Sequence, residues 1–335
     1  MVMQIIKKLP TADEIKEKLP LSPELADIKK NRDNQIKNIM SGKDDRMLMI
    51  IGPCSAHDEK AVLEYSSLLA KLQEEVRDKL VLMPRIYTNK PRTNGVGYQG
   101  IMHQPDPNDV PNLAKGIEAM RKLHINVLRE TGLSGVDEML YPDNLCYLDD
   151  ILSYIAVGAR SVENQQHRLV SSGVDVPVGM KNPTSGDLQI MINAIYAAQR
   201  PHVFSYSGNE VKSMGNPMAH SILRGGKCGP NYDLDTIKRL IDLYGKNLGL
   251  KPNLPKIVVD ASHDNSGKQA EKQPGIVQDV LRSREIVGDI IVGIMVESYL
   301  EGGKGEKYGQ SITDSCLGWE ASRALVLDTT DRLSR

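Results

Sequence analysis

Two groups of residues with different chemistry stand at the ends of short apolar segments in this chain. The first group is cationic and consists of Arg85, Arg160, Lys181 and Arg224, with Lys90 and Arg92 following in the loop YTNKPRT. Guanidinium groups bind phosphate and carboxylate through paired hydrogen bonds. A surface salt bridge would explain any single cation, but it explains the clustered set poorly. The pattern favours a ligand with several negative charges.

The second group combines a thiol, an imidazole and carboxylates. Its members are Cys54, His263 and Glu297, with Asp314 in the loop after the last apolar segment. Together these donors suit a transition metal such as Mn, Fe, Co, Zn or Cu, and do not suit a calcium cage. Taken singly, a buried Cys or a lone His more often has a structural role. His57 forms a local Cys54-x-x-His57 pair, and we prefer the distant His263 as the ligand.

Eight nearly continuous apolar segments must position these side chains. They cover residues 48–55, 80–87, 125–130, 153–160, 176–181, 220–226, 256–263 and 289–297. Such segments are typical of strands buried on both faces, and helical stretches separate them. Eight strands alternating with helices over about 250 residues predict an α/β fold, a (β/α)8 TIM barrel. A doubly wound open sheet is the alternative.

Each predicted strand ends in a residue capable of chemistry. In chain order these are Cys54, Arg85, Glu130, Arg160, Lys181, Arg224, His263 and Glu297. Barrel enzymes build their active sites from the carboxyl ends of several strands. A charged or reactive residue at the end of every predicted strand therefore predicts a catalytic barrel.

The first 45 residues differ from the rest and form an N-terminal extension to a catalytic barrel at 46–335. Thr11-Ala-Asp-Glu14 is a capping box, and Ser22-Pro23 starts a helix that should reach about Ser41-Gly42. Apolar Met3, Ile5 and Ile6 suit a short strand. We expect this arm to contact a neighbouring subunit of a homo-oligomer, either a dimer or a tetramer; the alternative is that it only covers the bottom of the barrel.

Composition excludes several classes of protein. The chain has 42 basic and 43 acidic residues and only one Phe and one Trp, so neither net charge nor base stacking indicates nucleic-acid binding. The four cysteines are far apart, without a CxxC, which favours a reducing compartment and a cytoplasmic protein. There is no apolar run of membrane-spanning length and no secretion signal.

Several motifs together resemble the type I 3-deoxy-D-arabino-heptulosonate 7-phosphate (DAHP) synthases. The matching segments, in family order, are Ile51-Gly-Pro-Cys54-Ser-Ala-His57-Asp58, Lys90-Pro-Arg-Thr93, Gly158-Ala-Arg160-Ser-Val-Glu163, Pro177-Val-Gly-Met-Lys181-Asn182, Leu223-Arg-Gly-Gly226, Asp260-Ala-Ser-His263 and Ser311-Ile-Thr-Asp314. The resemblance implies a barrel enzyme that condenses phosphoenolpyruvate with erythrose 4-phosphate and releases inorganic phosphate. This reaction is the first step of the shikimate pathway to the aromatic amino acids.

The resemblance also implies roles for individual residues. Cys54, His263, Glu297 and Asp314 would hold one divalent metal ion, Mn²⁺ first, with Fe²⁺, Co²⁺ or Zn²⁺ as alternatives. Arg85, Lys90, Arg160, Lys181 and Arg224 would bind phosphoenolpyruvate, and Arg92 and Thr93 the phosphate of the aldose. Lys90, placed between both substrates, is the candidate proton donor, so that Lys90, Cys54 and His263 form the catalytic set.

Two other functions stay open at this point. The first is a 3-deoxy-D-manno-octulosonate 8-phosphate synthase, which uses arabinose 5-phosphate; that family has Lys-Ala-Asn-Arg-Ser where this chain has Lys90-Pro-Arg-Thr93. The second is a non-catalytic barrel that retains anion sites. The segment Ser205–Pro217 is shorter than its counterpart in feedback-regulated DAHP synthases, where it belongs to the effector pocket, so regulation also stays open.

Overall fold

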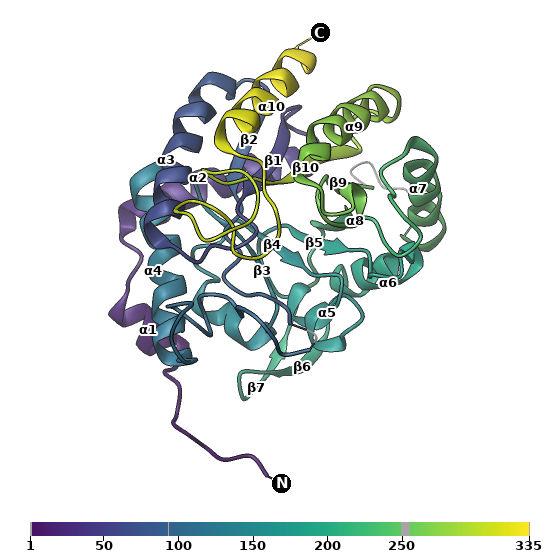
Figure 1. Cartoon of the computed structure of the whole chain (residues 1–335). Coiled ribbons are helices and arrows are strands. Elements are labelled where there is room, and N and C mark those ends of the chain that lie inside the picture. The colour runs from purple at the N-terminus through teal and green to yellow at the C-terminus, as the bar shows by residue number, and fades with distance from the viewer. Residues whose placement is uncertain (1, 93, 249–254, 335) are drawn as a thin grey trace.

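The computed structural model describes residues 2–92, 94–248 and 255–334. Its main sheet contains eight parallel strands in the order β2-β1-β10-β9-β8-β5-β4-β3, and helices surround it (Figure 1). The strands are β1 (Met47–Gly52), β2 (Leu80–Pro84), β3 (Val136–Glu138), β4 (Tyr154–Val157), β5 (Val178–Lys181), β8 (Ala219–Leu223), β9 (Ile257–Asp260) and β10 (Ile291–Glu297). The helices are α1 (Ala12–Lys18), α2 (Pro23–Met40), α3 (Glu59–Val76), α4 (Leu113–Thr131), α5 (Gln165–Ser171), α6 (Leu188–Ala198), α7 (Leu234–Leu248), α8 (His263–Ser266), α9 (Gln273–Val287) and α10 (Trp319–Arg332).

The two edge strands of this sheet, β2 and β3, contact each other and nearly close the sheet into a barrel. Arg85, just after β2, forms a parallel bridge with Val136, and the Ile86 amide donates to the Val136 carbonyl at 2.8 Å. An open doubly wound sheet would leave these two edges apart. The predicted barrel is therefore confirmed.

The prediction for the third strand is wrong. Residues 125–130 lie inside α4, which ends at Thr131 and is closed by Gly132 in the left-handed conformation, with φ 68°. The segment INVLRE is apolar and β-branched, but it continues the helical spacing of Ile117, Met120 and Leu128, all of which are buried. The true third strand is the short β3, which follows the Gly132 cap.

The N-terminal extension is mostly packed against the barrel. The Thr11 capping box forms as predicted, and α2 starts at Pro23 after the Ser22 cap. Arg32 on α2 donates to the Leu82 carbonyl at 2.7 Å, and Ile36 is fully buried beneath the barrel interior. Part of the extension thus covers the bottom of the barrel, as the alternative expected.

The predicted N-terminal strand does not form within this chain. Residues 2–10 have no regular structure, and the first of them run away from the barrel (Figure 1), whereas Lys7 donates to Asn112 and the Pro10 carbonyl accepts from Tyr147. Met3, Ile5 and Ile6 are at least 79% exposed. The physical reason is that a strand needs a free sheet edge for its backbone hydrogen bonds, and the barrel uses its edges to close.

Two further features complete the fold. A small hairpin of β6 (Val203–Tyr206) and β7 (Asn209–Lys212) stands apart from the barrel. The first helical stretch between strands is α3, and its apolar side chains from Val62 to Val76 are buried in the core. None of the helices in the described part of the chain is long and apolar enough to cross a membrane.

Candidate active site

The carboxyl ends of the barrel strands gather the predicted site residues at one mouth. Lys181 and Glu297 are the last residues of β5 and β10, and Arg85 and Arg224 directly follow β2 and β8. Cys54 lies two residues after β1, and His263 lies three residues after β9. Parallel strands all end on the same side, so segments far apart in sequence deliver these groups to one place.

Arg85 and Glu297 form a buried ion pair at the floor of this mouth. Arg85 Nη2 lies 3.0 Å from Glu297 Oε1, and the guanidinium stacks on the Tyr87 ring at 3.7 Å from its centroid. Burial lowers the pKa of Arg85, but Glu297 and then Tyr87 raise it by more, so the net pKa lies above the ordinary value. Burial raises the pKa of Glu297, and Arg85 and His263 lower it to a net value below normal. Both groups are therefore charged at neutral pH.

Asp260 connects a predicted substrate cation to a predicted metal ligand. This fully buried carboxylate has Oδ2 at 3.0 Å from Lys181 Nζ and 2.9 Å from His263 Nδ1. Burial raises the pKa of Asp260, but His263 and Lys181 bring it well below the ordinary value. Sequence reasoning quoted Asp260 within a motif and gave it no role. Its position three residues before His263 was the available signal.

Three of the predicted cations therefore have carboxylate partners, which follow or end other strands of the barrel. Arg224 pairs with Asp264, as Arg85 does with Glu297 and Lys181 with Asp260. These pairs are not evident in the sequence, because no carboxylate lies in the same apolar segment as its cation. Arg160 lies in the turn after β4 and is exposed.

Lys90 and Arg92 follow β2 in the loop above the mouth. Lys90 is 8% exposed, and its Nζ lies 3.3 Å from Cys54 Sγ. Arg92 is half-buried, and its Nε donates to the Tyr98 carbonyl at 2.8 Å. Thr93, predicted to bind phosphate with Arg92, lies outside the described residues.

The four predicted metal ligands stand as two neighbouring pairs. Cys54 Sγ lies 3.8 Å from Asp314 Oδ2, and His263 Nε2 lies 3.9 Å from Glu297 Oε1. Burial and the nearby Glu297 raise the pKa of the Cys54 thiol. Lys90 and Arg85 lower it by less, so the net pKa lies above the ordinary value. In this arrangement, no three His, Cys, Asp or Glu side chains of the described residues converge closely enough to ligate one ion.

The chemistry of these donors still fits a divalent metal. Glu297 Oε1 is buried, and no described donor meets it with hydrogen-bond geometry, although Arg85 is close. The Nδ1 side of His263 is taken by Asp260, so Nε2 is the nitrogen that faces Glu297. Such a carboxylate behind a histidine is the usual support of a metal ligand.

The alternative ligand His57 has other partners. Its Nδ1 lies 3.3 Å from both the hydroxyl and the carbonyl oxygen of Ser55, and its ring packs edge-on against Tyr98. Burial lowers the pKa of His57. Neither Cys54 nor Asp314 is among these partners.

The corrected third strand changes one site residue. Glu130 is exposed on α4, away from the strand ends, and the carboxylate at the end of β3 is Glu138. A Cβ placed on Gly158 would lie 2.2 Å from Glu138 Oε1, so the Glu138 carboxyl reaches over the end of β4. Sequence reasoning missed Glu138 because β3 is only three residues long and has no apolar run to mark it.

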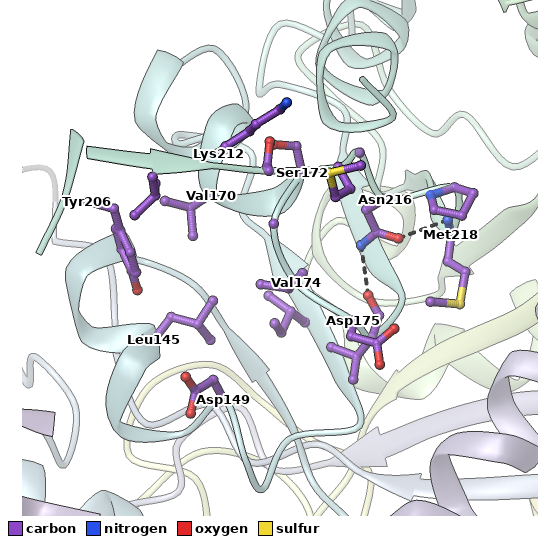
Figure 2. Close-up of a pocket in the computed structure, with 18 of the residues that line it drawn as sticks. Leu145, Asp149, Val170, Ser172, Val174, Asp175, Tyr206, Lys212, Asn216 and Met218 are labelled. Atoms are coloured by element: carbon purple, nitrogen blue, oxygen red, sulfur yellow. Dashed lines mark hydrogen bonds between the residues drawn. The ribbon is translucent and has the colours of Figure 1, made fainter. Parts of the chain in front are cut away.

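A cavity of about 840 Å³ lies elsewhere, between the β6–β7 hairpin and the amino ends of β4 and β5. Figure 2 shows apolar Leu145, Val174 and Tyr206 on its walls, with charged Asp149 and Lys212 at its border. None of its lining residues belongs to either predicted site group. We therefore locate the active site at the strand ends and treat this cavity as separate.

Comparison with known proteins agrees with this geometry. Residues 22–326 match the model of the DAHP synthetase I family. A phospho-2-dehydro-3-deoxyheptonate aldolase of Haemophilus influenzae is 40% identical over 330 residues, covering 94% of this chain and 89% of that protein. The Phe-sensitive phospho-2-dehydro-3-deoxyheptonate aldolase of Escherichia coli K12 is 38% identical over 334 residues, covering 96% of this chain and 93% of that protein.

A solved structure gives the same result for the fold. The phospho-2-dehydro-3-deoxyheptonate aldolase of Francisella tularensis superposes with a TM-score of 0.92 at 30% identity, covering 99% of this chain and 98% of that one. Motifs, barrel, strand-end residues and relatives all lead to one assignment: the chain belongs to the DAHP synthetase I family.

Proposed function

We propose that this chain condenses phosphoenolpyruvate with erythrose 4-phosphate and water to give DAHP and inorganic phosphate, with one divalent metal ion. The observation that carries the proposal is the single mouth where buried cations adjoin the thiol, imidazole and carboxylate group. Lys90 joins the two sets through its 3.3 Å contact with Cys54. The relatives named as aldolases of this reaction support the same function.

Phosphoenolpyruvate carries a phosphate and a carboxylate, so it needs several cations. Arg85, Lys181 and Arg224 are buried, and Arg160 is exposed. Arg224 and its partner Asp264, whose side chain is 35% exposed, can separate when an anion arrives. Paired guanidinium hydrogen bonds then hold phosphate oxygens in a fixed orientation.

In the proposed reaction, C3 of phosphoenolpyruvate attacks the aldehyde carbon of the aldose. A carbon–carbon bond forms, the aldehyde oxygen takes a proton from Lys90, and positive charge develops at C2. Water adds to C2 and loses a proton. The C2–O bond to phosphate then breaks while the new C2 hydroxyl passes its proton to the departing phosphate, which releases inorganic phosphate and leaves the ketone. Arg92 would hold the aldose phosphate so that the aldehyde faces C3.

Cys54, His263, Glu297 and Asp314 would hold the metal ion, with Mn²⁺ as the first candidate and Fe²⁺, Co²⁺ or Zn²⁺ as alternatives. Bound there, the ion would supply a Lewis acid for an oxygen of the aldehyde or of water. The donor types and the acceptor-only Glu297 Oε1 support this assignment. Asp260 would keep the His263 ring oriented with Nε2 toward the site.

The substrate preference tests the proposal directly. We expect loss of phosphoenolpyruvate with erythrose 4-phosphate and little with arabinose 5-phosphate. The opposite preference would make the chain a 3-deoxy-D-manno-octulosonate 8-phosphate synthase. Phosphoenolpyruvate binding without turnover of either aldose would make it a non-catalytic anion-binding barrel.

The proposal places the enzyme in the cytoplasm as a homo-oligomer, a dimer or a tetramer. The free cysteines Cys54, Cys146, Cys228 and Cys316 support a reducing compartment. The exposed apolar side chains of Met3, Ile5 and Ile6 support a contact with a second subunit. The proposed partners are therefore small-molecule substrates and further copies of the chain, not nucleic acid or membrane.

A further inference from the structure

The barrel is joined between β2 and β3 by an unusual set of contacts. The Ile86 amide donates to the Val136 carbonyl, as in an ordinary parallel ladder. Alternate residues of a strand face the same neighbour, so the next amide toward β3 is that of Thr88. It donates to the Asp137 side chain, Oδ1, at 2.9 Å. A carboxylate thus continues the strand pairing where the backbone ladder stops.

Asp137 is saturated with hydrogen-bond donors. Its Oδ1 also accepts from the Glu138 amide at 2.7 Å, and its Oδ2 accepts from the Thr88 hydroxyl and lies 3.3 Å from His124 Nε2. The residue is 3% exposed. Four donors, two from Thr88 in the loop after β2, one from β3 and one from α4, compensate the burial of this carboxylate and fix its position.

His124 fixes Asp137 from behind. It is a fully buried residue of α4, and since Oδ2 is an acceptor, Nε2 must carry the hydrogen between them. The ring lies against Gly135, where a Cβ would come within 2.6 Å of Nδ1. Only glycine at this position lets the imidazole approach so closely.

The segment from Thr88 to Lys90 is short and tightly held. The Thr88 carbonyl accepts from the Met102 amide at 3.2 Å, and the Lys90 amide donates to the Gln99 carbonyl at 3.0 Å. Gly100, with φ +98°, leaves no room for a Cβ, which would meet the Thr88 oxygen at 2.4 Å. Because Lys90 is only two residues from Thr88, the position of Thr88 determines where the Lys90 side chain begins.

We propose that Asp137, oriented by His124, is a positioning residue for Lys90. Asp137 touches neither the predicted metal ligands nor the predicted substrate cations in the described contacts. It acts through Thr88, by holding the loop so that Lys90 Nζ reaches the mouth beside Cys54. This inference rests on the proposed function, in which Lys90 donates the proton.

The test compares Thr88→Val and Asp137→Asn with a matched control, Thr329→Val. Thr329 is also fully buried and loses a single hydroxyl hydrogen bond, to the Leu325 carbonyl, in α10 far from the mouth. For each protein we would measure kcat, the KM for phosphoenolpyruvate, and hydrogen–deuterium exchange of the peptide containing residues 86–92. Thr88→Val keeps the size of the side chain, so we expect this variant to fold. It keeps the test usable if Asp137→Asn does not fold.

We expect kcat to fall about 10-fold in Thr88→Val and up to about 100-fold in Asp137→Asn, as for a misplaced catalytic group. The KM for phosphoenolpyruvate should rise by less than kcat falls, since Arg85 and Lys181 are untouched and only Lys90 of its predicted cations is displaced, and residues 86–92 should exchange about tenfold faster. Thr329→Val should match the parent in all three measurements.

Three results would overturn the inference. They are a kcat equal to that of the control, a fall in kcat without faster exchange, and a rise in KM with kcat unchanged. Failure of the proposed function is distinguishable, because the parent protein would then show no turnover at all. In that case unchanged exchange in Thr88→Val would still refute the part of the inference that concerns the join between β2 and β3.

Discussion

Replacing Asp260 with asparagine would test the electrostatic core of the site. The fully buried Asp260 carboxylate neutralises Lys181 and contacts His263. Asparagine has nearly the same size, so the substitution removes the charge and leaves the packing. Lys181 would then be a buried ammonium group without a counterion.

The expected loss of stability is large and its pH dependence has a definite sign. Breaking a buried ion pair from one side costs about 3–5 kcal/mol, and with an m-value of about 3 kcal/mol/M the urea midpoint should fall by about 1 M or more. Burial raises the pKa of Asp260, but His263 and Lys181 bring it well below normal. Such a group stabilises the fold above the unfolded-state pKa of about 3.9, and the contribution is lost as pH falls through the folded-state pKa.

Urea unfolding of the parent and of Asp260→Asn, followed from about pH 3 to pH 8, measures both quantities. The difference between the two midpoints should be constant above about pH 5 and should narrow below about pH 4. Asp175→Asn is the control, since the Asp175 side chain is 95% exposed and pairs with Lys37 at the surface. A midpoint for Asp260→Asn equal to that of the control, or a difference that widens in acid, would refute the reasoning.

Four further predictions follow from the site and its surroundings. Cys54→Ser should weaken Mn²⁺ binding measured by calorimetry. The control Cys146→Ser changes a half-buried cysteine outside the site and should not weaken it. Equal Mn²⁺ affinities of the two variants would remove Cys54 from the ligand set. Arg92→Lys keeps the charge but loses the fork, so the KM for erythrose 4-phosphate should rise and that for phosphoenolpyruvate should not; the reverse would show that the two anion sites are exchanged. Deletion of residues 2–9 should reduce the mass found by light scattering, because Met3, Ile5 and Ile6 expose apolar side chains that the proposed contact with a second subunit would cover; an unchanged mass contradicts the contact. If Phe, Tyr or Trp inhibits turnover, the cavity in Figure 2 is the candidate binding site; Val174→Trp, which fills it, should then abolish the inhibition and leave uninhibited turnover intact, and inhibition that survives this substitution would exclude the cavity.

The sequence was most informative where one local property decided the structure. Strands buried on both faces are continuously apolar, so seven of the eight could be placed, and caps at Thr11 and Ser22 set the starts of α1 and α2. It failed at 125–130 because an apolar, β-branched segment satisfies both strand and helix patterns. Only the packing of α4 against the barrel decides between them.

The sequence predicted which residues form the candidate site, but not which of them form ion pairs with one another. Strand-end positions gave Cys54, Arg85, Lys181 and Glu297 without any knowledge of contacts. Which carboxylate faces which cation depends on the order of strands around the barrel, and this order cannot be inferred from one segment at a time. Glu138 was missed because β3 is too short to form an apolar segment, and Asp260 received no role because its contacts with Lys181 and His263 appear only in the structure.

The central claim is a metal-dependent condensation at this mouth. The most direct measurement dialyses the protein against a chelator, titrates Mn²⁺ back while counting ions bound per chain, and follows phosphoenolpyruvate loss and phosphate release in the presence of erythrose 4-phosphate. We expect no turnover in the metal-free protein and full turnover at one ion per chain, with one phosphate released for each phosphoenolpyruvate consumed. Full turnover by the metal-free protein, or phosphate release that does not require the aldose, would contradict it.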